Sequence, residues 1–384
     1  MITGTTNTTI TPSTSTTTNI SITSTTSSTV STSTTLTTRT TTSTTSSSTT
    51  STKSTSTTST VTSTSTTTTS SAFCWNSTAT TVAGRVGVSD DAANRLDRPF
   101  GVALDSSNAL YISDQTNNRV QKWLAGASTG TTVAGQASAV AGTTSDSLDA
   151  PSGVLLDSSG NIYVADTNNN RVQYWLQGAS SGTTIVGVTG SAGSGNNELT
   201  NPYGIARDPS SGTLYIADQS NHRVMSYIAG ASSGTVVAGG NGLGTANTQL
   251  KYPVGIYFDA SSNSLIIANT GANNIVRWAL GASSWTLIAG SINGTRGSNA
   301  TLLNYPVGVT MDPMGNTYVA DRNNHRIQLF LAGQSIGMTI AGVTNATGTS
   351  STLLNNPYSM VFDAQLNLYV ADTYNHRVQK FMHC

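Results

Sequence analysis

Charged residues are scarce in this 384-residue sequence, at 9% of the chain, and 17 Lys and Arg balance 17 Asp and Glu. Because no basic excess exists to attract a phosphate backbone, we expect no nucleic acid as a partner. The sequence also lacks a run of roughly 18 apolar residues, so no transmembrane segment is expected. Four His and two Cys leave little material for a metal centre.

The first 72 residues contain no Asp or Glu, and only 15 of them are neither Ser nor Thr. Such a stretch has too few apolar side chains to offset the entropy lost on ordering, so we expect residues 1–72 to be disordered. The composition is typical of an O-glycosylated, mucin-like stalk, with an unmodified disordered tail as the alternative. Residues 1–5 lack the basic and apolar regions of a signal peptide, so we expect either an N-terminus further upstream or another export route.

A repeat with a period of about 51 residues runs from about residue 96 to the end. Each copy begins with a Pro before a short strand, and the six are Pro99, Pro151, Pro202, Pro253, Pro306 and Pro357. Five copies also place an Arg five positions after the Asp that ends the second strand. These pairs are Asp114 and Arg119, Asp166 and Arg171, Asp218 and Arg223, Asp321 and Arg326, and Asp372 and Arg377. The fourth copy has Asn269 and Asn274 instead.

Each copy reads as four short strands separated by Asn-, Ser- and Gly-rich turns, which is the pattern of a propeller blade. In the first copy we expect strands at 101–104, 109–113, 119–124 and 131–134. The sixth copy stops after its third strand, and Thr80–Gly84 duplicates the missing fourth one. Residues 73–384 are therefore predicted to form an all-β, six-bladed β-propeller in which an N-terminal strand closes the last blade.

The two cysteines fall at the same turn of the sixth blade when the copies are aligned. Only this blade has a chain break there, so we predict a disulfide between Cys74 and Cys384, with two unrelated free thiols as the alternative. A disulfide of this kind indicates an oxidising compartment. The expected location is therefore extracellular or at the cell surface.

Three segments resemble the NHL repeat: Ala-Asp-Gln-Ser-Asn-His-Arg-Val at 217–224, Ala-Asp-Arg-Asn-Asn-His-Arg-Ile at 320–327 and Ala-Asp-Thr-Tyr-Asn-His-Arg-Val at 371–378. The resemblance covers residues 78–384 and implies a six-bladed propeller. The family includes zinc-dependent lyases that complete peptide amidation, and related propellers hydrolyse lactones around a central calcium. A propeller metalloenzyme of the amidating-lyase or lactonase kind is therefore the alternative function.

No catalytic or metal-binding constellation is found. His222, His325 and His376 occupy one repeat position in three different blades, too far apart to share a zinc ion, and His383 lies beside the seam. The expected inner strands carry no acid before the Asp at their ends, where we expect turn contacts. These are Asp105, Asp157, Asp208, Asp259, Asp312 and Asp363. We predict no cofactor, and because the fourth copy lost Asp and Arg together, we interpret the Asp–Arg pairs as structural staples.

The loops between blades are long and differ from one another, which is typical of recognition surfaces on a rigid frame. Phe100, Tyr203 and Tyr358 are expected at the channel mouth on this face, as a ligand-binding rim or as packing between blades. Acceptors for N-glycosylation in or near the propeller are Asn76, Asn293, Asn299 and Asn345. Glycans on the last three would shield blades 4–6. The sequence thus predicts a monomeric, non-enzymatic propeller that recognises a protein, peptide or glycan.

Overall fold

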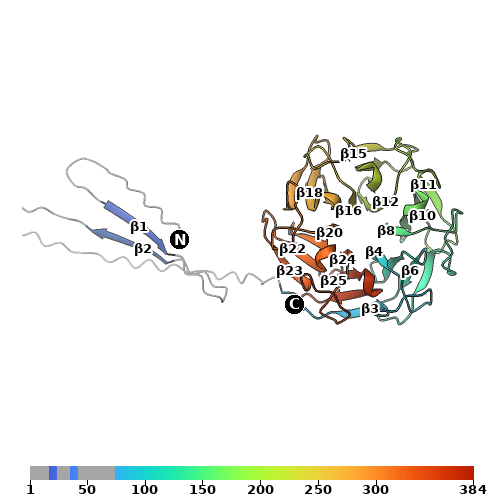
Figure 1. Ribbon diagram of the computed structural model, residues 1–384, viewed down its shortest axis with the longest axis horizontal. Coiled ribbons are helices and arrows are strands. Elements are labelled where there is room, and N and C mark those ends of the chain that lie inside the picture. Colours follow the sequence, from blue (N-terminus) through green and yellow to red (C-terminus); the bar gives the residue numbers. More distant parts are fainter. Residues whose placement is uncertain (1–16, 24–34, 42–73) are drawn as a thin grey trace, which may run out of the picture. The chain divides into compact units, whose positions relative to one another are not determined.

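The computed structural model describes residues 17–23, 35–41 and 74–384 of the chain. From Cys74 onward the chain forms six antiparallel four-stranded sheets, which follow one another around a central channel as the blades of a propeller (Figure 1). In blades 1–5 the strands lie in chain order, from the innermost strand at the channel to the outermost strand at the rim, whereas the outermost strand of blade 6 comes from the start of the propeller. The predicted all-β, six-bladed architecture is confirmed.

The strand limits lie within two residues of those expected from the sequence. Blades 1 and 2 consist of β4 (Pro99–Leu104), β5 (Leu110–Asp114), β6 (Arg119–Trp123), β7 (Thr131–Gly135), β8 (Pro151–Leu156), β9 (Ile162–Asp166), β10 (Arg171–Trp175) and β11 (Thr183–Gly187). Blades 3 and 4 consist of β12 (Pro202–Arg207), β13 (Leu214–Asp218), β14 (Arg223–Tyr227), β15 (Thr235–Gly239), β16 (Pro253–Asp259), β17 (Ser264–Asn269), β18 (Asn274–Ala279) and β19 (Thr286–Gly290). Blades 5 and 6 consist of β20 (Pro306–Met311), β21 (Thr317–Asp321), β22 (Arg326–Phe330), β23 (Gly337–Gly342), β24 (Pro357–Phe362), β25 (Leu368–Asp372), β26 (Arg377–Phe381) and β3 (Thr80–Gly84).

Short 3-10 helices, which the sequence did not predict, connect the second and third strands of blades 2–6. They are η1 (Thr167–Asn169), η2 (Gln219–Asn221), η3 (Thr270–Ala272), η4 (Arg322–Asn324) and η5 (Thr373–Asn375). Each is followed by an Asn or His in the left-handed conformation, which returns the chain into the third strand. No helix among the described residues is long and apolar enough to cross a membrane.

Two further strands, β1 (Thr17–Thr23) and β2 (Thr35–Thr41), pair with each other in an antiparallel register that sets Thr17 opposite Thr41. β-branched Thr favours an extended backbone in both segments. The disorder expected for residues 1–72 stays a prediction, and most of that range lies outside the described residues.

The second strand of a blade is buried on both of its faces. Every residue of β5, β13, β17, β21 and β25 is buried, because a neighbouring blade covers each side of the sheet. Burial on both faces explains why these strands read as continuous apolar runs such as Leu-Ile-Ile-Ala rather than alternating ones.

The hydrophobic core is divided into six clusters, and each consists mainly of residues from two neighbouring blades. Trp123 of blade 1, for example, belongs to a cluster with Val378 of blade 6. Apolar burial contributes about 25 cal/mol per Å², and here that contribution arises between blades rather than within them. A blade therefore depends on both of its neighbours.

The ring closes where β3, the first strand of the propeller, pairs with β26, the last strand in the chain. The antiparallel register sets Gly84 opposite Arg377 and Ala83 opposite Val378. Beside this seam Cys74 and Cys384 form a disulfide with a Cα–Cα distance of 5.2 Å, and the Cys384 amide donates to the Cys74 carbonyl at 3.0 Å. Both the strand exchange and the disulfide predicted from the sequence are confirmed.

Loss of the seam disulfide should destabilise the propeller. The bond joins residues 310 positions apart, and a cross-link of this kind contributes on the order of 2–4 kcal/mol by restricting the unfolded chain. We expect the Cys74→Ser/Cys384→Ser variant to unfold at lower denaturant concentration than the oxidised chain, and reductant to shift only the native chain. Equal midpoints for the variant and the oxidised chain would contradict this assignment.

Candidate functional site

The five Asp–Arg pairs predicted from the repeat lie side by side and are buried. In each pair the Arg Nε donates to the Asp Oδ2 at 2.7–2.9 Å, and no member is more than 7% exposed. The other carboxylate oxygen accepts a backbone amide from the loop that enters the blade, as Asp218 does from Thr200 at 2.7 Å. Arg223 donates to three carbonyls of the same loop, at Ser194, Gly195 and Glu198.

In each of these five blades, the contacts attach the inter-blade loop to the buried ion pair. Burial raises the pKa of Asp114 to about 6 and moves the pKa of the other four paired carboxyls in the same direction, while the Arg and the amide donors oppose this shift. The cost of removing both charges from water offsets most of the attraction within a buried ion pair, so such a pair adds little net stability, although removing one partner is strongly destabilising. We therefore interpret the pairs mainly as contacts that position the loops.

In blade 4 the inter-blade loop is attached without an ion pair. Asn269 Oδ1 still accepts the loop amide of Lys251 at 2.7 Å, but no Arg is present to reach the carbonyl of Gln249. The indole Nε1 of Trp285 donates to that carbonyl at 2.9 Å. In blades 2, 3, 5 and 6 the equivalent carbonyl, on the residue before the buried loop Leu, accepts from the Arg.

Trp285 occupies a position that is Gly in blades 1, 2, 3 and 5 and Ala79 in blade 6. In the four blades with Gly, a Cβ would collide with the aromatic residue that ends the third strand. At Gly182, for example, it would lie 2.5 Å from Trp175 Nε1. In blade 4 the corresponding Trp278 donates its Nε1 to Ala282 at 2.9 Å. This exchange was not predicted from the sequence, although its signal is visible there: the one copy without the Asp–Arg pair is also the one with a Trp at this position.

The three histidines of the repeat are inter-blade acceptors. Each occupies a left-handed position, and its Nδ1 accepts the amide that precedes the Pro of the next blade at 3.2–3.3 Å. The pairs are His222 with Tyr252, His325 with Asn356 and His376 with Arg98. In the other three blades Asn118, Asn170 and Asn273 accept the same amide through Oδ1. An imidazole can do this only while Nδ1 carries no proton.

The predicted aromatic rim is assembled at one end of the channel, on the face of the inter-blade loops. The ring centroid of Phe100 lies 4.2 Å from that of Tyr358 and 5.5 Å from that of Tyr203. Phe100 is buried, whereas the two tyrosines are partly exposed. The rings therefore pack on one another, Phe100 of blade 1 against Tyr358 of the neighbouring blade 6 and against Tyr203 of blade 3. The two tyrosines still present surface at the mouth, and their role in ligand binding stays a prediction.

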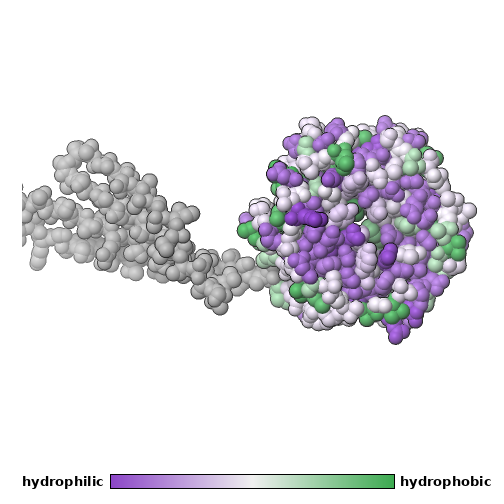
Figure 2. Space-filling view, viewed as in Figure 1, coloured by the Kyte–Doolittle hydropathy of each residue, from purple (hydrophilic) through white to green (hydrophobic). Residues whose placement is uncertain are grey.

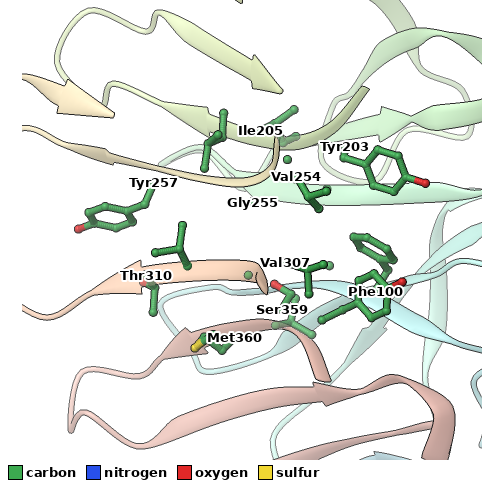
Figure 3. Close-up of a pocket in the computed structure, with 18 of the residues that line it drawn as sticks. Phe100, Tyr203, Ile205, Val254, Gly255, Tyr257, Val307, Thr310, Ser359 and Met360 are labelled. Atoms are coloured by element: carbon green, nitrogen blue, oxygen red, sulfur yellow. The ribbon is translucent and has the colours of Figure 1, made fainter. Parts of the chain in front are cut away.

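Beyond the rim the channel is a narrow cavity of about 170 Å³ lined by the six inner strands (Figure 3). Phe100 and Tyr203 stand at one end of it and Tyr257 at the other. The strands approach closely because five of the six have Gly at the same position, with Ser359 in β24: a Cβ at Gly101 would lie 2.3 Å from the carbonyl oxygen of Ser152 in the next blade. A ligand larger than a small molecule can therefore contact only the mouth of the channel.

The channel lining does not fit an axial zinc or calcium ion. It consists of Gly, apolar and aromatic residues with one Ser and one Thr, and contains no carboxylate or imidazole. Nowhere among residues 74–384 do three or more His, Cys, Asp or Glu side chains gather in a way that could hold a metal ion. The Asp at the end of each inner strand accepts amides of its own turn, as Asp312 does from Met314 and Asn316.

The four glycosylation candidates in the described propeller, Asn76, Asn293, Asn299 and Asn345, are all exposed. Asn299 accepts two backbone amides in its own turn, from Thr301 and Leu302. Asn293 and Asn299 lie in the loop that enters blade 5, and Asn345 lies in the loop that enters blade 6. Exposure leaves each of them open to modification.

Comparison with known proteins places the repeat in a family. Residues 148–174, 303–330 and 354–381 match the NHL repeat, and these segments fall in register in blades 2, 5 and 6. The chain is an NHL repeat protein. Its NHL segments contain the Asp–Arg pairs and the left-handed Asn or His, so the family motif coincides with the contacts that hold the loops.

Individual relatives are distant. The chain is 25% identical over 258 residues to "Protein SUPPRESSOR OF QUENCHING 1, chloroplastic" of Arabidopsis thaliana, which covers 59% of this chain but only 24% of that protein. An auxiliary nutrient binding protein from Bacteroides thetaiotaomicron aligns with a TM-score of 0.59 at 16% identity, over 79% of this chain and 76% of the other. A gluconolactonase from Xanthomonas campestris aligns with a TM-score of 0.54 at 14% identity, over 80% and 97%. At these identities the structural likeness shows the fold alone.

Trp285 should be essential to blade 4. Trp285→Ala removes a buried indole and leaves the Gln249 carbonyl without its donor, and truncations of buried aromatic residues cost about 3–5 kcal/mol. We expect denaturant unfolding to show a loss of this size. Restoring the pattern of the other blades, with Asn269→Asp, Asn274→Arg and Trp285→Gly together, should recover most of it. A triple variant no more stable than Trp285→Ala would refute the exchange.

The histidine column should make stability depend on pH. Burial lowers the pKa of His222 and His325 below 6.5, with Lys251 and Arg322 adding to the effect. Because the folded pKa is depressed, their contribution is complete above pH 6.5 and is lost as pH falls below it. In the double variant His222→Asn/His325→Asn, the Asn Oδ1 can accept the same backbone amide, as Asn does in blades 1, 2 and 4. We expect the variant to match the native chain in urea unfolding at pH 8 and to be the more stable of the two near pH 5; parallel pH profiles would contradict this.

Proposed function

We propose that this NHL propeller is a non-catalytic recognition module that binds a protein, peptide or glycan through the face formed by its inter-blade loops. The observation that carries the proposal is the construction of that face. Loops of different length and sequence are fastened to a common frame by the buried Asp–Arg pairs, around a mouth lined by Tyr203 and Tyr358. Variable segments on a rigid scaffold are the usual setting of recognition.

The balance of acidic and basic residues supports binding to a ligand other than a nucleic acid. On the face shown in Figure 2, hydrophilic residues cover most of the centre and hydrophobic ones form small separate patches nearer the rim. No extensive apolar patch of the kind that marks obligate assembly is seen there. We therefore propose that the propeller acts as a monomer.

The seam disulfide supports an extracellular or cell-surface location, because such bonds persist in oxidising compartments. In this setting residues 1–72 would act as the stalk that presents the propeller at residues 73–384, and the exposed asparagines would carry glycans. The lactonase or lyase alternative gains no support from the channel, whose lining does not fit the metal ion that these reactions would require.

The face can be tested by comparing matched substitutions on opposite sides of the propeller. A ligand for the full chain is first selected on glycan and protein arrays. We expect Tyr203→Ala to weaken its binding by about 30-fold, the effect of removing an aromatic hot spot worth about 2 kcal/mol. Ile228→Ala, at a 70% exposed residue in a turn on the opposite face, should leave the affinity unchanged.

Both variants must retain the unfolding midpoint of the native chain for this comparison to count. A ligand whose affinity falls with Ile228→Ala and not with Tyr203→Ala would place recognition on the opposite face and overturn the proposal.

A further inference from the structure

Blade 5 breaks the repeat at the channel mouth by placing a cation there. The first residue after the second strand is Thr in blades 2, 4 and 6, and each Thr hydroxyl donates to the carbonyl of the next blade's Pro at 2.7–2.8 Å. Blade 5 has Arg322 at this position instead. The repeat therefore does not need an Arg here.

Arg322 is stacked on aromatic rings. Its guanidinium carbon lies 4.6 Å from the ring centroid of Tyr358 and 5.4 Å from that of Tyr305. Tyr358 belongs to the rim at the mouth, and Tyr305 is 36% exposed. A guanidinium held over two aromatic rings is pre-organised, since the contacts restrict its position while its N–H groups have no acceptor among the described residues.

The charge of Arg322 has no partner among residues 74–384. No hydrogen bond or ion pair links its guanidinium to a described residue, and its Nε is buried without an acceptor. All four carboxylates of blades 5 and 6 are engaged elsewhere: Asp321 and Asp372 pair with Arg326 and Arg377, while Asp312 and Asp363 bind the turns at the far ends of their strands. A half-buried cation without a counter-charge is a site for an external anion.

The groups around Arg322 favour a sugar as the carrier of that anion. Asn304, Asn323, Asn355 and Asn356 lie in the adjoining turns, and an amide can donate to one hydroxyl and accept from another. The tyrosine rings offer flat apolar surface for a pyranose ring. Two common modes of peptide recognition, strand addition and helix docking, use an unpaired strand edge or an apolar groove. The segments here are turns instead, and the strands behind them begin with Pro306 and Pro357, which have no amide hydrogen.

We propose that Arg322, stacked between Tyr305 and Tyr358, binds the carboxylate of an acidic glycan at the channel mouth. The assignment rests on the proposed recognition function and narrows its ligand to sugars that carry a carboxylate. The guanidinium binds the carboxylate edge-on, and the amides of the adjoining turns bind the hydroxyls.

The test is titration calorimetry of the full chain, with N-glycans removed, against a panel of uronic-acid and sialylated oligosaccharides and their methyl esters. Esterification removes only the negative charge, so we expect each ligand that binds to lose at least about tenfold in affinity as the ester. Arg322→Thr introduces the residue of blades 2, 4 and 6. This variant should bind the acid about tenfold more weakly than the native chain does and should bind the ester with unchanged affinity. The difference in affinity between acid and ester should therefore disappear.

Two controls define the site. Arg322→Lys keeps the charge but not the planar fork and should recover only part of the loss. Arg296→Thr removes an exposed Arg from the loop entering blade 5 and should bind like the native chain.

Equal affinity for acid and ester, undiminished discrimination in Arg322→Thr, or binding of carboxylate-terminated peptides but of no acidic oligosaccharide would overturn the assignment. If an array-selected ligand depends on Tyr203 and not on Arg322, this assignment fails and the recognition function stands. If no ligand requires residues of the inter-blade-loop face for binding, the proposed recognition function is wrong, and the assignment of Arg322 is wrong with it.

Discussion

Each blade of this propeller buries its two faces only because another blade stands on either side, so the pairing of β3 with β26 decides whether the core is complete. Without that pairing, blade 6 would lack its outer strand, and Leu96, Trp123 and Val378 would lose the partners that bury them. The disulfide between Cys74 and Cys384 acts at this same point. It joins the two ends whose separation would open the ring.

The closed ring provides a frame on which loops are fixed from two directions. The Asp–Arg pairs hold each loop to its own blade, and the left-handed Asn or His ties the start of that blade to the preceding one. Both contacts end on backbone groups, which every residue type except Pro possesses in full. The loops are therefore free to vary in sequence without losing their anchorage, and this freedom suits a recognition surface.

The repeat is informative where it is broken. In blade 4 the loss of the ion pair is compensated by Trp285, which reaches the same class of carbonyl from another direction. In blade 5 the replacement of Thr by Arg322 has no such structural counterpart, because the guanidinium satisfies no group in the described propeller. The first departure keeps the frame intact, whereas the second adds an unpaired charge at the mouth, and this contrast separates a structural substitution from a functional one.

The number of blades, their strands, the closing segment and the disulfide could be predicted from the sequence, because they follow from the period of the repeat and from the alignment of Thr80–Gly84 and the two cysteines with the blade template. The sequence also indicated that Phe100, Tyr203 and Tyr358 meet at the mouth. The contacts of Arg322 with Tyr305 and Tyr358, and the amide that His222 accepts from Tyr252, are visible only in the folded structure. These contacts depend on side-chain directions at left-handed turns and on the approach of neighbouring blades, which periodicity along the chain does not specify.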